Sequence, residues 1–211
     1  QETAGWKLLF RVTRPGGGPI SGLRDGFSDF GEYAARRPIV DTVPGLMPPL
    51  DWYVLGPVRQ VPVAARNWRL PLDSMASSTE WPPPAEGYTW RHLNANETRN
   101  NIVDLNAVLG ETSHAVAYAA TEITVDRPTP VRLTSRSDDG IVIWLNGRPL
   151  HAWHSPRKFA EGRDIIETTL QPGPNRILCR ISQGTGEWVF QANVFDVTTS
   201  TPIPLRAPAG P

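Results

Sequence analysis

The sequence predicts an all-β chain, folded as an antiparallel β-sandwich of the jelly-roll type with long proline-rich loops. Short apolar segments recur at intervals of about 8–12 residues with turn residues between them, which is typical of sandwiches and barrels. The 211 residues include 22 prolines and 18 glycines. Because proline fixes φ and cannot donate a ladder hydrogen bond, this density favours short strands over long helices. Eight tryptophans favour a packed domain over disorder.

The charge balance excludes one class of partner. Lys and Arg together number 21, as do Asp and Glu, and no cationic run interrupts the chain. Nucleic-acid binding needs a clustered basic face, so we expect no nucleic-acid partner. Apolar runs such as residues 6–12 are far shorter than the roughly 18–20 residues of a spanning helix, so we expect no transmembrane segment. Cys179 is the only cysteine and lies in an apolar run, which predicts a buried thiol and no internal disulfide.

Residues 1–50 form a region with its own character. A strand is expected over 6–13, followed by an irregular N-terminal arm in which only 29–37 could form a helical turn. The arm contains three aromatic side chains that a free linker would seldom expose, and we take them as candidate partner-docking residues: Phe27, Phe30 and Tyr33.

Residues 51–198 carry the expected sandwich, and 199–211 form a proline-rich tail that we expect to be extended or frayed. Strands are predicted at 52–57, 60–65, 88–93, 103–109 (a short strand or a turn), 115–125, 131–135, 141–145, 148–153, 165–170, 175–181 and 188–197. Asp139-Gly140 predicts a tight hairpin after 131–135, and Asn146-Gly147 is the strongest hairpin signal in the chain. Residues 68–87 are expected to be a long loop.

Several of these segments, in their order, resemble a known class of module. The run Ser137 to Gly147 (SDDGIVIWLNG), the Pro-Gly-x-Asn turn at 172–175 and the strand 177–181 resemble galactose-binding-like jelly-roll modules of bacterial envelope and secreted proteins. The Ser-Asp-Asp-Gly entry also resembles PA14 lectin-like modules. The resemblance covers about 52–197. It implies the fold and an extracytoplasmic location, periplasmic or secreted, but leaves function open, since such modules bind sugars, bind proteins or brace a neighbour.

The resemblance also implies a candidate calcium site at Asp138 and Asp139. In PA14 lectin-like relatives a matching pair holds calcium, which in turn coordinates a sugar, and carboxylates are hard ligands of the kind that calcium prefers. The alternative is that both side chains accept hydrogen bonds from backbone N–H groups of the turn. No other cofactor is expected.

Four further residues complete the candidate ligand-binding set. His151 and Trp153 should share one face of their strand, with His154 on the other, and Trp153 could stack on the C–H face of a sugar ring. Its alternative is an edge tryptophan that packs on its neighbours. Asn146, in the hairpin turn, and Arg148, directly after it, are the other two candidates.

Trp81, Pro82 and Pro83 begin a polyproline-like segment that a partner's aromatic groove could recognise. The alternative is a rigid loop that caps the sandwich. No Gly-x-Ser-x-Gly, His-Glu-x-x-His or phosphate-loop motif is present, and we expect the chain not to be an enzyme. A glycosidase pair built from scattered glutamates remains a minor alternative.

Two functions follow from these features. The first is a non-catalytic scaffold or accessory subunit that docks through its arm, loops and tail onto a larger extracytoplasmic assembly of protein subunits, which could be membrane-bound. The second is a carbohydrate-binding, lectin-like module, with or without calcium. Both predict the same core, in which eight apolar side chains should be buried: Trp52, Leu55, Tyr118, Ile141, Ile143, Leu145, Ile177 and Ile181.

Overall fold

The computed structural model of the chain describes residues 51–58, 70–93, 97–98 and 101–204. The predictions for the strand at 6–13, for the arm with Phe27, Phe30 and Tyr33, for the strand at 60–65 and for the end of the tail lie outside these residues. Within them, no helix is long and apolar enough to cross a membrane.

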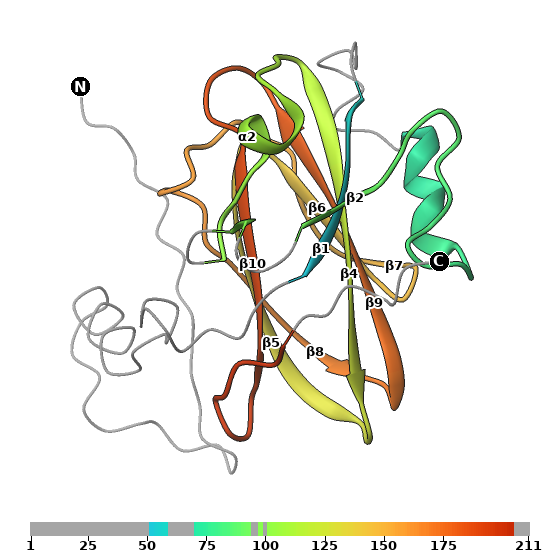
Figure 1. Cartoon of the computed structure of the whole chain (residues 1–211). Coiled ribbons are helices and arrows are strands. Elements are labelled where there is room, and N and C mark those ends of the chain that lie inside the picture. Colours follow the sequence, from blue (N-terminus) through green and yellow to red (C-terminus); the bar gives the residue numbers. More distant parts are fainter. Residues whose placement is uncertain (1–50, 59–69, 94–96, 99–100, 205–211) are drawn as a thin grey trace, which may run out of the picture. The chain divides into compact units, whose positions relative to one another are not determined.

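The described chain is an antiparallel β-sandwich, as predicted (Figure 1). One sheet has six strands in the order β2-β1-β4-β9-β6-β7, and the other has four in the order β3-β10-β5-β8. The strands of the first sheet are β1 (Trp52–Val58), β2 (Arg91–Leu93), β4 (Ala115–Val125), β6 (Ile141–Leu145), β7 (Arg148–Trp153) and β9 (Gly173–Gln183). Those of the second are β3 (Val103–Asp104), β5 (Thr129–Asp138), β8 (Asp164–Leu170) and β10 (Val189–Asp196).

Three strands have the predicted bounds: β4, β6 and β7. The others differ mainly at their ends, where local pattern is a weak guide. Two short helices were not predicted. The 3₁₀ helix η3 (Pro71–Ser77) lies inside the expected loop, and α2 (Leu105–Leu109) follows the two residues of β3. In the tail, Pro202 forms a bridge with Phe195 of β10, so this part of the tail is not frayed.

All eight predicted core residues are buried, but they belong to two separate clusters. The larger cluster fills the space between the sheets and contains Trp52, Ile143 and Ile181. Leu55 and Tyr118 point the opposite way, into a second cluster on the outer face of the six-stranded sheet. Because side chains alternate along a strand, neighbouring apolar residues of β1 and β4 supply both clusters. Both faces of this sheet are therefore buried over its central strands, whereas most residues of the edge strands β2 and β7 are exposed or half-buried.

The outer cluster is covered by η3 and the loop that follows it (teal and green in Figure 1). Asp73 of η3 is buried there and accepts three hydrogen bonds: from Arg180 Nη1 at 2.6 Å, from Tyr118 Oη at 2.9 Å and from the Leu70 backbone N–H at 2.8 Å. Burial and the Asp73 carboxylate raise the pKa of Tyr118 well above its ordinary value. A buried charge is tolerated here because it is paired and hydrogen-bonded.

The predicted hairpin at Asp139-Gly140 is wrong. β5 belongs to the four-stranded sheet and β6 to the six-stranded sheet, so this turn crosses between the sheets. Gly140 does not have a positive φ. It is needed for close approach instead, because a Cβ at this position would lie 2.8 Å from the Trp153 carbonyl oxygen. The hairpin at Asn146-Gly147 is confirmed, with φ of 49° and 79° and β6 paired to β7.

Candidate functional site

The structure brings together some of the six candidate ligand-binding residues and separates others. Trp153 is paired with Ile141, immediately after the Asp138–Gly140 turn, whereas Arg148 is paired with Leu145 at the other end of β6. Five residues of strand span about 16 Å. Asp138, Asp139 and Trp153 therefore lie at one end of the sandwich, which we call the binding end. His151 lies part of the way along β7, and Asn146 and Arg148 lie at the opposite end.

At the binding end, the two aspartates hold neighbouring loops in place. Asp139 Oδ2 accepts a hydrogen bond from the Gly184 backbone N–H at 2.6 Å, and the Asp139 N–H donates to the Ser182 carbonyl at 3.1 Å. The peptide bond between Asp138 and Asp139 is cis. Asp138 accepts a hydrogen bond from the Phe159 backbone N–H. The turn is thus tied to the β9–β10 loop and to the β7–β8 loop.

Asp138 stands in a negative electrostatic environment. Burial, together with the charges of Asp139, Glu187 and Glu161, raises its pKa to about 6. Glu161 and Glu187 come from two different loops, which is why sequence proximity did not reveal them. Like charges disfavour ionisation of a partly desolvated carboxyl group, so Asp138 changes charge at a mildly acidic pH.

Few oxygen ligands are available for the calcium ion predicted at Asp138 and Asp139. Calcium takes six to eight oxygen ligands, and Asp138 and Asp139 each already accept a backbone hydrogen bond. Among the described residues, no three His, Cys, Asp or Glu side chains are grouped so that they could hold a metal ion. Further oxygens would have to come from backbone carbonyls, water or a ligand. The calcium site stays a prediction.

Trp153 is the exposed aromatic residue of the binding end. It is the last residue of β7, which forms an edge of the six-stranded sheet, and its side chain is 41% exposed. Its indole Nε1–H donates to the Ser155 carbonyl at 2.9 Å, and the guanidinium of Arg157 lies 5.2 Å from the ring centroid. The ring therefore has a fixed orientation although it faces solvent.

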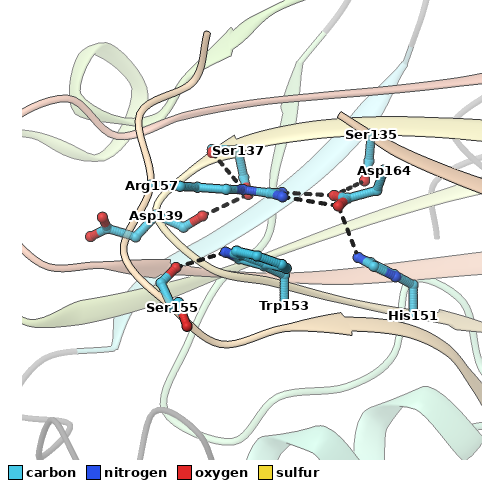
Figure 2. A network of polar contacts seen from close by, with 8 residues as sticks. All are labelled: Ser135, Ser137, Asp139, His151, Trp153, Ser155, Arg157 and Asp164. Atoms are coloured by element: carbon cyan, nitrogen blue, oxygen red, sulfur yellow. Dashed lines mark hydrogen bonds and ion pairs between the residues drawn. The ribbon is translucent and has the colours of Figure 1, made fainter. Parts of the chain in front are cut away.

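Arg157 connects this ring to the second sheet, as Figure 2 shows. Its guanidinium makes a bidentate pair with Asp164 of β8, at 2.9 and 2.7 Å. It also donates to the Ser137 hydroxyl at 2.8 Å and to the Ser137 carbonyl at 3.2 Å. The Ser137 hydroxyl in turn donates to the Asp139 carbonyl at 2.8 Å. One side chain thus contacts β5, β8 and the aromatic ring at the end of β7.

Asp164 also contacts the two other polar side chains of this network, Ser135 and His151. It accepts from the Ser135 hydroxyl at 2.8 Å, and its Oδ1 lies 3.2 Å from His151 Nε2. Burial alone would raise the pKa of Asp164, but hydrogen bonds from Arg157, His151 and Ser135 hold it well below its ordinary value. His151 is paired with Ile143 and Trp153 with Ile141, and both isoleucines belong to the core between the sheets. Directly paired residues of antiparallel strands lie on the same face of a sheet, so His151 and Trp153 share that face, as expected.

The sequence reasoning did not identify Arg157 or Asp164. Arg157 lies in the loop before β8 and Asp164 is the first residue of β8, so the fold of this loop brings them together. Their contacts with Ser135 and Ser137 exist because β5 and β8 are adjacent. Gly162, in the same loop as Arg157, is the residue of the sequence that reflects this arrangement. A Cβ at that position would lie 2.6 Å from Arg157 Nε, so the loop needs glycine there to accommodate the guanidinium.

Asn146 serves the opposite end of the sandwich. Its side chain donates to Asn175 Oδ1 at 3.0 Å and accepts from the Arg176 backbone N–H at 2.8 Å. Asn175 is fully buried and also bonds the Gln171 backbone. These contacts join the turn at Asn146-Gly147 to the turn between β8 and β9. Asn146 and Arg148 therefore lie at the other end of the sandwich from Trp153, and a ligand-binding role for them remains a prediction.

The polyproline-like segment packs over the outer cluster. Trp81 and Pro82 are half-buried and Pro83 is buried, with its carbonyl accepting from Trp90 Nε1 at 2.6 Å. Arg176 lies 5.7 Å from the Trp81 ring centroid and donates to the Thr79 carbonyl. This placement agrees with the alternative of a capping loop. A partner-docking role for the segment remains a prediction.

No family model and no curated protein matches this chain. Among solved structures, the chain is similar to the "PA14 sugar-binding domain from RTX adhesin", with 17% identity over 44% of this chain and 51% of that one, and a TM-score of 0.38. It is also similar to the Epithelial Adhesin 9 A domain from Candida glabrata, solved with Galb1-4GlcNAc, with 9% identity over 74% and 85% and a TM-score of 0.41.

Enzymes are among the similar structures as well. The β-glucosidase from Kluyveromyces marxianus matches with 11% identity over 70% of this chain but 16% of its own, and a TM-score of 0.41. The chain spans about half the length of the PA14 structures that it matches. All these likenesses concern the fold alone, and the sandwich itself is established by the strand pairing described above.

Proposed function

We propose that this chain is a glycan-binding β-sandwich module, whose binding end presents Trp153 as a stacking surface for a sugar ring. The observation that carries the proposal is a tryptophan that is both exposed and fixed. In the described part of the chain, the other five tryptophans are buried or half-buried, whereas Trp153 is 41% exposed and held by Ser155 and Arg157. A ring that is already ordered loses little conformational entropy when a ligand stacks on it.

The polar groups around Trp153 suit a hydroxyl-rich ligand. The Asp138–Gly140 turn lies next to the end of β7, and carboxylate oxygens accept hydrogen bonds from sugar hydroxyls. Whether calcium takes part in binding is left to the test below. We propose binding without catalysis, and an extracytoplasmic location as implied by the sequence resemblance. The accessory-subunit function stays a prediction, because the aromatic candidates of its arm, Phe27, Phe30 and Tyr33, lie outside the described residues.

The test is a titration of the full chain with four disaccharides (lactose, maltose, cellobiose and chitobiose), each with calcium and with a chelator. We expect at least one to bind, and Trp153→Ala to weaken its binding about tenfold or more, as is common for a central tryptophan of an interface. Tyr88→Ala is the matched control, because Tyr88 is similarly exposed, at 38%, but lies on the capping loop.

Two results would contradict this proposal. One is equal weakening by Trp153→Ala and Tyr88→Ala, which would mean that the ligand does not stack at the binding end. The other is release of nitrophenol from nitrophenyl glycosides by the purified chain, which would show catalysis. Binding that persists in the presence of a chelator would show that calcium is not required, and it would not affect the proposed stacking on Trp153.

A further inference from the structure

Two buried Arg–Asp pairs are present in the described chain, and they serve different surfaces. Arg180 and Asp73 attach η3 to the outer face of the six-stranded sheet, at 2.6 Å. Arg157 and Asp164 lie at the binding end, at 2.7 Å. The side chains of Arg180 and Arg157 are almost equally buried, at 2% and 6% exposure. Each also lies over a tryptophan, Trp144 for Arg180 and Trp153 for Arg157.

We propose that Arg157 is the positioning residue of the binding end: it fixes the orientation of the Trp153 ring, and it leaves only the opposite ring face open to a ligand. Its effect on affinity rests on the proposed function, whereas its effect on the ring does not. Arg157 itself is too deeply buried to be a principal ligand contact.

The contacts of Arg157 explain why arginine is required. Four donor–acceptor contacts, two to Asp164 and two to Ser137, fix the plane of the guanidinium. The guanidinium carbon lies over the indole, 5.2 Å from the ring centroid, and the second constraint on the ring is its hydrogen bond to Ser155. Lysine would keep the positive charge but could not make the bidentate pair or present a flat surface. Gly162 leaves room for the guanidinium, since a Cβ there would meet Nε at 2.6 Å.

The same contacts link the ring to the aspartate turn. Arg157 donates to the carbonyl and hydroxyl oxygens of Ser137, and the Ser137 hydroxyl donates to the Asp139 carbonyl (Figure 2). A substitution of Arg157 should therefore alter the positions of both the Trp153 ring and the Asp138–Asp139 turn. These are the two parts of the proposed site that a sugar would contact, and they come from different sheets.

The experiment uses the full chain labelled with 5-fluorotryptophan and observed by fluorine NMR. Signals of Trp153 and Trp144 are assigned with Trp153→Phe and Trp144→Phe. We expect Arg157→Lys to shift and broaden the Trp153 signal while the Trp144 signal stays in place. Arg180→Lys, the matched control, should do the reverse. In the disaccharide titrations above, Arg157→Lys should weaken binding about three- to tenfold, from the cost of reordering the ring, and Arg180→Lys less than about twofold.

An unchanged Trp153 signal in Arg157→Lys would overturn the proposal, and so would equal shifts of that signal in both lysine variants. If Arg157→Lys does not fold, Ser137→Ala replaces it, because it removes one acceptor of the guanidinium and should move the same signal by a smaller amount. If the wild-type chain binds none of the four disaccharides, the proposed function loses its support, and the fluorine spectra still decide whether Arg157 positions the ring.

Discussion

At the scale of single residues, the binding end depends on side chains whose properties are set by distant parts of the chain. Asp138 is an ordinary turn aspartate in the sequence, yet it is crowded by Glu161 and Glu187 from two other loops. Asp164 is an ordinary strand residue, yet it is the acceptor for Arg157 and Ser135, and its Oδ1 lies 3.2 Å from His151 Nε2. Neither environment could be predicted from sequence, because both depend on which loops meet at one end of the sandwich.

Asp138→Asn should stabilise the fold near neutral pH. The pKa of Asp138 is raised to about 6 in the folded chain, so the folded state binds a proton more readily than the unfolded one. Stability from this group is therefore present at low pH and is lost as the pH rises from about 4 through about 6. Asparagine carries no charge and avoids this loss. Thermal unfolding should show a larger gain for Asp138→Asn at pH 7 than at pH 5.

The control for this experiment is Asp126→Asn, which changes an exposed aspartate and should have little effect at either pH. The opposite outcome, in which Asp138→Asn destabilises the chain equally at both pH values, would show that the hydrogen bond to Phe159 matters more than the repulsion among the carboxylates. Asp164 does not disturb the comparison, because its lowered pKa affects stability only below about pH 4.

At the scale of elements, the strands followed their sequence patterns, whereas some of the connections between them did not. β4, β6 and β7 have their predicted bounds because alternation and the Asn146-Gly147 turn are local signals. The turn at Asp139-Gly140 has the composition of a hairpin but joins two sheets. The 3₁₀ helix η3 was missed because its stability comes from tertiary contacts, chiefly those of Asp73 with Arg180 and Tyr118.

Asp73→Ala should destabilise the chain by about 3–5 kcal/mol, since it leaves the Arg180 charge buried without its carboxylate and removes the acceptor of Tyr118. Urea unfolding measures this change. η3 should also become more accessible to proteases, because Asp73 is its main polar attachment to the sheet.

Glu167→Gln provides the comparison for this variant. Glu167 forms an exposed pair with Arg132, at 2.8 Å, and exposed pairs contribute only about 0–1 kcal/mol. Similar losses in the two variants would mean that the Asp73–Arg180 pair contributes no more than a surface contact, and that the outer apolar cluster alone holds η3 in place.

At the scale of the whole molecule, the sequence predicted a β-sandwich and a buried core, and the structure adds a second apolar cluster on the outer face of one sheet. Apolar residues on both faces of β1 and β4 were visible in the sequence, but the pattern does not tell which loop covers the second face. Of the predicted site residues, Asp138, Asp139 and Trp153 meet at one end of the sandwich, and Asn146 and Arg148 lie at the other.

The central claim is that a glycan stacks on Trp153 at the binding end. The measurement that tests it most directly is amide chemical-shift mapping of the full chain during titration with the four disaccharides. The account predicts that shifts cluster in the Asp138–Gly140 turn, around Trp153–Arg157 and in the loop before β10, and that Trp153→Ala strongly reduces them at the same ligand concentration. Shifts confined to the turn at Asn146 or to the capping loop, and unchanged in that variant, would contradict it.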